Sequence, residues 1–195
     1  IDVLGNNVTN DSVIRGEMII DEGDAYSAIL LNKSVNKLKA RNIFSNVKSR
    51  IKEGSEANLK IIEIDVEEKA TGELMAGAGV GTDGTSFMAA VSENNWLGRG
   101  IKLQSSLNVS EEKVSGSIEV LNPNYNYSDN AVFGSFSLAS SDLTESSGYE
   151  TSATGVSLGT EFEQYENIYL APSFSLKHET IEAEDTASAQ IKKMD

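Results

Sequence analysis

The chain has 195 residues, a formal net charge of −14 and no cysteine. This length allows one or two domains, and the lack of cysteine excludes disulfides and thiolate chemistry. The negative charge argues against nucleic acid as a partner, because nucleic-acid binding requires clustered Lys and Arg, and no apolar run approaches the roughly 20 residues of a membrane-spanning helix.

Residues 1–70 predict a small α+β domain with the order β-α-α-β-β. Ile1–Leu4 is strand-like, and Thr9 or Asn10 can cap a first helix. Ser27 begins a second helix, which ends near Asn42. The apolar residues recur at helical spacing in both helices: Val13, Ile14 and Met18 in the first, and Leu30, Leu31, Val35 and Leu38 in the second.

Two β-prone runs, Ile43–Ile51 and Leu59–Glu67, complete this region. One sheet with two helices on one face can bury a small core at this size. We therefore predict one compact domain over residues 1–70.

After residue 70 apolar and polar residues alternate with a period of two, as in β-strands. The clearest run is Ile101–Val109. We predict seven strands of about 9–11 residues, the length that crosses a bilayer when tilted. The predicted connections are Thr82–Thr85, Glu93–Gly100, Ser110–Lys113, Asn122–Asn130, Ser140–Gly148 and Glu163–Asn167. The acidic segment Glu179–Asp195 is predicted to begin a surface loop.

A soluble β-sandwich also alternates, so other features must distinguish it from a membrane barrel. The polar face is mostly Ser, Gly, Asn, Gln and Thr, and the strands exceed the usual soluble length of about 5–6 residues. Aromatic residues gather near strand ends, as in the belts at membrane interfaces: Trp96, Tyr125, Tyr127, Tyr149, Tyr165 and Tyr169. These features favour a membrane barrel, with a soluble β-sheet as the alternative. Because bacterial single-chain barrels have an even number of strands, at least about eight, seven strands would be the first part of a longer barrel.

Several short motifs together resemble one family. The motifs Gly5-Asn6, Val13–Met18, Glu22–Asp24 and Phe44–Val47, in the order β-α-α-β-β, resemble a POTRA domain. The later segments resemble the last POTRA domain and barrel start of the BamA family of outer-membrane protein assembly factors: Val66–Gly72, Gly77–Gly84, Asn94–Gly100 and Asn122-Pro123. The resemblance covers essentially the whole chain and is most specific in residues 1–125. A relative from the translocation and assembly module is the closest alternative, and a two-partner secretion transporter is a further one.

The resemblance implies a POTRA domain at residues 1–70 in the periplasm, and the first seven strands of a truncated β-barrel at residues 71–195 in the bacterial outer membrane. Periplasmic turns are then expected at 93–100, 122–130 and 163–167. The implied work is the folding and insertion of other barrels, without catalysis, metal or cofactor. The implied partners are client outer-membrane proteins, accessory lipoproteins and the lipid bilayer.

The resemblance also implies specific site residues. The first barrel strand is the edge with which a client strand pairs: Gly72, Glu73, Leu74, Met75, Ala76, Gly77, Ala78, Gly79, Val80 and Gly81. Its small side chains would ease separation from the closing strand, although they could also simply relieve crowding in a curved sheet. Glu22 is predicted to contact an accessory lipoprotein, with an ordinary solvated carboxylate as the alternative. Trp96 is predicted to anchor the chain at the membrane interface.

Enzymatic functions find little support in these residues. The chain has one histidine, His178, and no nucleophile-elbow motif. The glycine-rich run Gly77–Gly81 precedes a predicted strand and not a helix, so it does not predict a phosphate-binding loop. The alternative to an assembly function is a passive outer-membrane pore or structural barrel with a periplasmic domain.

Overall fold

The computed structural model describes residues 1–56, 58–81 and 84–194. The chain forms two compact units. Unit 1 comprises residues 1–72 together with the segments 93–102 and 122–129, and unit 2 comprises residues 73–92, 103–121 and 130–195. Unit 1 therefore contains the α+β domain and two turns of the barrel region, a grouping that the sequence pattern did not indicate.

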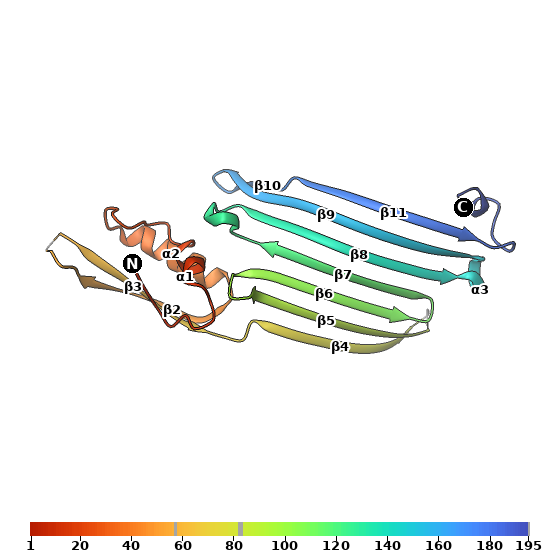
Figure 1. The fold of residues 1–195 in the computed structure, drawn as a ribbon, viewed down its shortest axis with the longest axis horizontal. Helices are drawn as coiled ribbons and strands as arrows, with labels where there is room; N and C mark the ends of the chain where they lie inside the picture. Colours follow the sequence, from red (N-terminus) through yellow and green to blue (C-terminus); the bar gives the residue numbers. More distant parts are fainter. Residues whose placement is uncertain (57, 82–83, 195) are drawn as a thin grey trace. The chain divides into compact units, whose positions relative to one another are not determined.

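Unit 1 has the predicted order β-α-α-β-β (Figure 1). Its elements are β1 (Asp2–Leu4), α1 (Asp11–Arg15), α2 (Ala28–Ala40), β2 (Phe44–Glu53) and β3 (Lys60–Glu68). The sheet order is β1-β3-β2, with β1 parallel and β2 antiparallel to β3. The two long strands each begin one residue later than predicted, which leaves Leu59 outside β3 and exposed.

Helix α2 follows its predicted apolar stripe. The Ser27 hydroxyl caps the helix by accepting a hydrogen bond from the Leu30 N–H. Leu31, Val35 and Leu38 are buried. Beyond the helix, Asn42 has a φ of 58°, a left-handed conformation that asparagine adopts more readily than most residues.

Helix α1 is shorter than predicted, because it ends at Arg15 and leaves Met18 outside the helix. Met18 is nevertheless buried. A tertiary hydrogen bond holds the chain here, since the Ile19 N–H donates to Ser34 Oγ at 2.8 Å. The Ser34 hydroxyl donates in turn to the Leu30 carbonyl at 2.9 Å. Packing against α2 therefore replaces further helical turns.

The core of unit 1 lies between the two helices and one face of the sheet. Ile14, Leu38 and Ile64 have no exposed surface. The other buried apolar members are Val13, Met18, Ile20, Leu31, Val35, Ile43, Phe44, Val47, Ile62 and Val66. No residue of the turn segments 93–102 and 122–129 belongs to this core, within the part of the chain that the structure describes.

Unit 2 is built around an eight-stranded sheet in which consecutive strands lie side by side (Figure 1). The strands are β4 (Gly72–Gly81), β5 (Gly84–Trp96), β6 (Ile101–Ser110), β7 (Lys113–Asn122), β8 (Ala131–Leu143), β9 (Tyr149–Tyr165), β10 (Ile168–Leu170) and β11 (Ser173–Ala183). The order is β4-β5-β6-β7-β8-β9-β10, and β11 also pairs with β9. The sheet confirms the predicted antiparallel succession of strands.

Several predicted boundaries in this region were wrong. Strands β5, β8 and β9 extend into segments that were predicted as connections, and a short helix α3 (Thr144–Ser147) joins β8 to β9. The predicted last strand is two strands, β10 and β11, separated at Ala171-Pro172. Strand β11 continues to Ala183, so the predicted surface loop does not begin at Glu179. The predicted turn Thr82–Thr85 lies partly outside the described residues, at Thr82 and Asp83.

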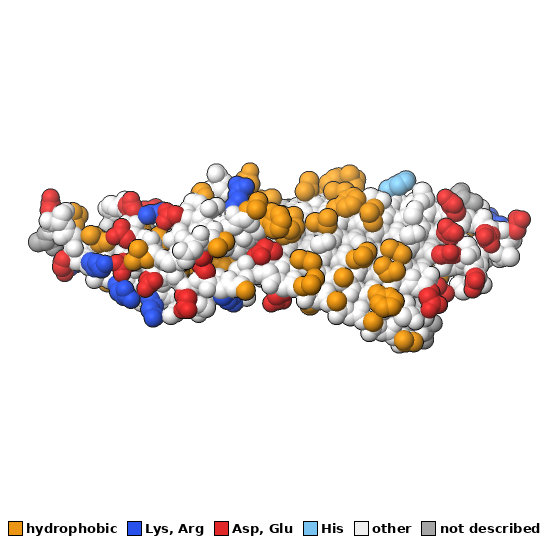
Figure 2. Space-filling model, turned by 60° about the horizontal axis from the view of Figure 1, so that its bottom comes forward, with side chains coloured by type: hydrophobic (Ala, Val, Ile, Leu, Met, Phe, Trp, Pro, Cys, Tyr) orange, Lys and Arg blue, Asp and Glu red, His pale blue; other side chains and the backbone are white. Residues whose placement is uncertain are grey.

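The two faces of the sheet differ in chemistry, as the alternation predicted. On one face Val156 lies opposite Phe136 on β8 and Leu176 on β11, and all three are exposed. On the other face the hydroxyls of Ser135 and Ser157 are hydrogen-bonded at 2.7 Å. Figure 2 shows apolar side chains gathered over the middle of the strands and acidic side chains towards one end.

No helix in the described residues is both long enough and apolar enough to cross a membrane.

Candidate functional site

Strand β4 lies at the edge of the unit 2 sheet. In the described part of the chain its only paired neighbour is β5. Every residue from Gly72 to Gly81 is exposed, with 77% of Leu74 and 87% of Val80 accessible. The predicted client-pairing residues therefore form one continuous, accessible edge strand.

The glycines of β4 leave space above the polar face of the sheet. A Cβ at Gly77 would lie 3.5 Å from Met88 Cγ, and a Cβ at Gly79 would lie 3.5 Å from Ser86 Oγ, so both positions face β5 side chains at ordinary contact distance. A groove of about 650 Å³ runs here. Its lining includes Gly77, Gly79, Ser86, Met88, Asn108 and Ser115. Gly77 and Gly79 therefore place no side chain over the polar face of β4.

Glu22 lies in the loop between α1 and α2 and is well exposed. Its carboxylate accepts a hydrogen bond from the Arg15 guanidinium at 2.8 Å, and Arg15 also pairs with Asp11. Glu22 thus belongs to a solvated surface network. Its predicted contact with an accessory lipoprotein stays a prediction.

Trp96 is the last residue of β5, and 44% of its surface is exposed. Leu97 follows with a φ of 55°, which is unusual for a bulky residue, and is 72% exposed. Two large apolar side chains therefore project from the β5–β6 turn. The predicted role of Trp96 as an anchor at the membrane interface stays a prediction.

The β5–β6 turn is attached to the α+β domain of unit 1. Asn95 is buried. Its side-chain NH₂ group donates to Thr9 Oγ1 at 2.9 Å, and its side-chain carbonyl accepts from the Gly100 N–H at 2.7 Å. The Asn10 N–H donates to the Gly98 carbonyl at 2.8 Å. Gly98 has a φ of 70°, and a Cβ there would lie 2.1 Å from the Val8 carbonyl oxygen. Only glycine allows this approach.

Glu68, the last residue of β3, binds the segment of the domain that contacts the β5–β6 turn. Its carboxylate accepts hydrogen bonds from the N–H groups of residues 7, 8 and 9. Burial acts to raise the pKa of Glu68, but the hydrogen bonds from Thr9, Val8 and Asn7 outweigh it and lower the pKa below its ordinary value. The stabilisation is therefore present at neutral pH and is lost as pH falls through the lowered pKa.

The β7–β8 turn, residues 122–129, is attached through Asn124, which is buried. The Asn124 side-chain amide donates to the Gly16 carbonyl at 2.9 Å and to Glu17 Oε1 at 3.3 Å. Its side-chain carbonyl accepts from the Asp129 N–H at 2.9 Å. One side chain therefore joins this turn to the end of α1.

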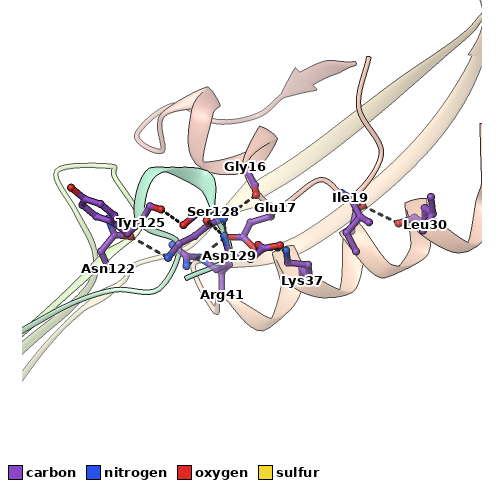
Figure 3. A network of polar contacts seen from close by, with 12 residues as sticks. Gly16, Glu17, Ile19, Leu30, Lys37, Arg41, Asn122, Tyr125, Ser128 and Asp129 are labelled. Carbon is purple, nitrogen blue, oxygen red and sulfur yellow. Dashed lines mark hydrogen bonds and ion pairs between the residues drawn. The ribbon is translucent and has the colours of Figure 1, made fainter. Parts of the chain in front are cut away.

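Four charged groups surround this contact (Figure 3). The Glu17 carboxylate is 6% exposed and lies 3.5 Å from Arg41 and 3.8 Å from Lys37. Lys37 also pairs with Asp129 at 2.6 Å, and Arg41 donates to the Gly100 carbonyl at 2.7 Å. Burial lowers the pKa of Arg41, and the Glu17 charge partly offsets this effect. We call Glu17, Lys37, Arg41 and Asp129 the charged cluster.

Comparison with known proteins identifies the family. A model of the POTRA family, described as surface antigen variable number repeat, matches residues 1–69, and a model of the Omp85 superfamily domain matches residues 95–194. The second match covers more than half of the chain. The chain belongs to the Omp85 superfamily.

Curated relatives confirm the resemblance to the BamA family. The chain is 35% identical over 102 residues to outer membrane protein assembly factor BamA of Buchnera aphidicola. The matched region covers 51% of this chain and 16% of that protein. It is 28% identical over 130 residues to BamA of Nitratidesulfovibrio vulgaris, with 65% of this chain and 16% of that protein covered. The chain thus spans only a small part of these relatives. The chain is located in the outer membrane, with its POTRA domain in the periplasm.

Two solved structures share the fold. BamA from Haemophilus ducreyi, crystallised without POTRA domains 1–3, matches with a TM-score of 0.74 and 22% identity over 93% of this chain and 36% of that one. CdiB from Acinetobacter baumannii matches with a TM-score of 0.53 and 10% identity over 93% of this chain and 37% of that one. These likenesses support the POTRA and barrel architecture.

Proposed function

We propose that the protein containing this chain folds and inserts β-barrel proteins into the outer membrane by offering β4 as a template strand. The curated relatives are named as outer membrane protein assembly factors, which supports this assignment. The single observation that carries the mechanism is the continuous exposure of β4 along the edge of the sheet.

Backbone pairing supplies the chemistry of this function. An edge strand presents N–H and C=O groups that another strand can bind, and lipid offers no competing hydrogen bonds. An incoming strand that pairs with β4 therefore satisfies its backbone groups before it enters the bilayer. This work requires no catalytic side chain, metal or cofactor.

The small residues of β4 suit a strand that must exchange partners. Gly77 and Gly79 contribute little side-chain packing, so separation of β4 from a neighbouring strand forfeits few contacts. Backbone hydrogen bonds do not depend on client sequence, and a thin strand accepts different client side chains. Templating by β4 would therefore serve many clients.

Cysteine cross-linking tests this function directly. We expect Ala76→Cys or Ala78→Cys to cross-link to a cysteine in the terminal strand of a client during assembly, because paired residues bring their Cβ atoms to about 4.5–5.5 Å. The chain has no cysteine of its own. Ile118→Cys is the matched control. Ile118 is 49% exposed, but its strand β7 is paired on both edges, with β6 and β8. Active assembly without cross-links at positions 76 and 78 would contradict templating and favour a passive barrel.

We further propose that Trp96 anchors the β5–β6 turn in the headgroup layer of the membrane. Trp96 is the only tryptophan of the chain, so its fluorescence reports this position alone. Brominated lipids should quench it most strongly when the bromines lie near the headgroups, since tryptophan prefers the interface. Equal fluorescence with and without brominated lipid at every depth would rule out the anchor.

Glu22 is proposed to contact an accessory lipoprotein of the assembly machinery. Its exposure and its place in the α1–α2 loop make the carboxylate accessible to a basic partner. Binding of a purified lipoprotein with unchanged affinity to the Glu22→Gln protein would count against this role.

A further inference from the structure

Residues 122–129, which we call the strap, contact the POTRA domain through polar groups. Asn124 bonds to Gly16 and Glu17, and Asp129 pairs with Lys37. Tyr127 lies against Gly16, where a Cβ would come within 2.4 Å of its ring. No strap residue enters the apolar core of the domain, within the described chain. Because its attachment is separate from that core, the strap can leave without exposing the core.

The backbone of the strap has three left-handed residues, and the strain lies at Tyr127. Asn126, Tyr127 and Asp129 have φ values of 53°, 58° and 59°. Asparagine and aspartate adopt this left-handed conformation more readily than other residues, but it is unfavourable for a bulky residue such as Tyr127 and persists there where surrounding contacts impose it. The Asp129 N–H bond to Asn124 and the Asp129–Lys37 ion pair are such contacts. Release of Asn124 would therefore relieve the strain as well as break hydrogen bonds.

The strap contacts the domain closely at Tyr127 and Asn124, but a cavity interrupts the packing between them. A cavity of about 310 Å³ lies beside α1 and is lined by residues including Ser12, Glu17, Arg41, Asn122, Tyr125 and Tyr127. Polar walls of this kind accept water. Tyr125 and Tyr127 remain 56% and 58% exposed. A wet, polar contact separates at lower cost than an apolar one.

The charged cluster makes the docked position specific. Glu17 and Asp129 balance Lys37 and Arg41 in charge, and Glu17 is almost completely buried. Lys37 contacts both carboxylates, one on the domain and one on the strap. Departure of the strap removes Asp129 and Asn124 from the cluster but leaves Glu17 paired with Lys37 and Arg41. The domain side therefore keeps its charges paired in both states.

We propose that the strap is a detachable tether between the POTRA domain and the β7–β8 hairpin, which undocks and redocks as a unit while the domain core and the strands stay folded. Asn124 is its positioning residue, and the charged cluster selects its docked position. The docked strap fixes the end of this hairpin to the domain, and the released strap frees it. This inference does not depend on strand templating.

Hydrogen exchange in the membrane-reconstituted full-length protein tests the tether. In the unmodified protein, the strap amides should exchange faster than the amides of β3, because they open without global unfolding. Asn124→Ala should speed strap exchange by roughly tenfold or more, since it removes several hydrogen bonds at once. Exchange in β3 should stay unchanged. Glu53→Gln, which alters an exposed ion pair with Lys60, is the control and should change neither rate.

Chymotrypsin provides a second readout, because it cleaves after tyrosine and the strap carries Tyr125 and Tyr127. Cleavage there should rise with Asn124→Ala in proportion to exchange, since both processes use the open state. The tether is refuted if the strap and β3 exchange at one common rate, or if Asn124→Ala speeds both equally. It is also refuted if Asn124→Ala alters neither strap exchange nor cleavage. Client insertion is measured separately, so failure of templating is distinguishable from failure of the tether.

Discussion

Proline at Ala76 or Gly77 in β4 should abolish client insertion in one of two distinguishable ways. Neighbouring residues of an antiparallel strand point their N–H groups in opposite directions, so one substitution removes a donor towards β5 and the other removes a donor at the open edge. Loss of the edge donor leaves a client carbonyl unsatisfied in lipid, which costs several kcal/mol, so client insertion should slow by roughly a hundredfold or more. The measurement is client insertion into vesicles containing each variant.

Thermal unfolding separates the two proline variants. The edge-directed proline should leave the melting temperature of the sheet near that of the parent, whereas the β5-directed proline should lower it. Gly77→Ala is the matched control, because its Cβ would meet Met88 at the ordinary distance of 3.5 Å and its N–H is retained. Normal insertion by a stable, edge-directed proline variant would show that β4 does not template clients.

Local signals were sufficient to predict the elements of the POTRA domain. The helical spacing of Leu31, Val35 and Leu38 identified the buried face of α2, and Ser27 marked its start. The end of α1 was not predictable in this way. Met18 continues the apolar stripe, yet the chain leaves the helix because Ser34, on a different element, binds the Ile19 N–H. Tertiary contacts therefore overrode the local pattern.

A proline between β10 and β11 indicated their division, but the alternation of apolar and polar residues continues through this position and predicted a single strand. Pro172 fits the period-two pattern of apolar residues, but it has no N–H to donate to a ladder. The structure accordingly divides the strand there, and the Pro172 carbonyl accepts a hydrogen bond from the Thr160 N–H at 3.1 Å. Backbone chemistry was the better guide at this position than side-chain polarity.

The polar contacts between the POTRA domain and the two turns were beyond sequence analysis. Asn124 and Glu17 are 107 residues apart, and Asn95 and Thr9 are 86 residues apart. Neither pair belongs to a periodic pattern. Glu17, Arg41 and Asn124 resemble surface residues in sequence, and only the fold shows that Glu17 and Asn124 are buried together beside the half-buried Arg41. Their burial makes them informative, because buried charges require partners.

Leu38→Ala should destabilise the POTRA domain by about 2–5 kcal/mol, because Leu38 has no exposed surface and its loss leaves a cavity in the core. Exchange of the β3 amides at Ile62 and Ile64 would measure this loss, since these positions open with the core. Ile29→Ala on the same helix is the control. Ile29 is 71% exposed, so its truncation should change stability by less than about 0.5 kcal/mol. Equal effects of the two substitutions would contradict the assignment of the core.

The same variant should also show how the strap depends on the domain. Lys37 precedes Leu38 on α2 and Arg41 directly follows the helix, and both contribute to the charged cluster. The strap opens without the core in the parent protein, so Leu38→Ala should speed β3 exchange much more than strap exchange. The two rates should converge only when the stability of the core falls to that of the docked strap. A strap that loosened as much as the core in Leu38→Ala would belong to the same cooperative unit as the domain, and the POTRA domain and the β7–β8 turn would then open only together.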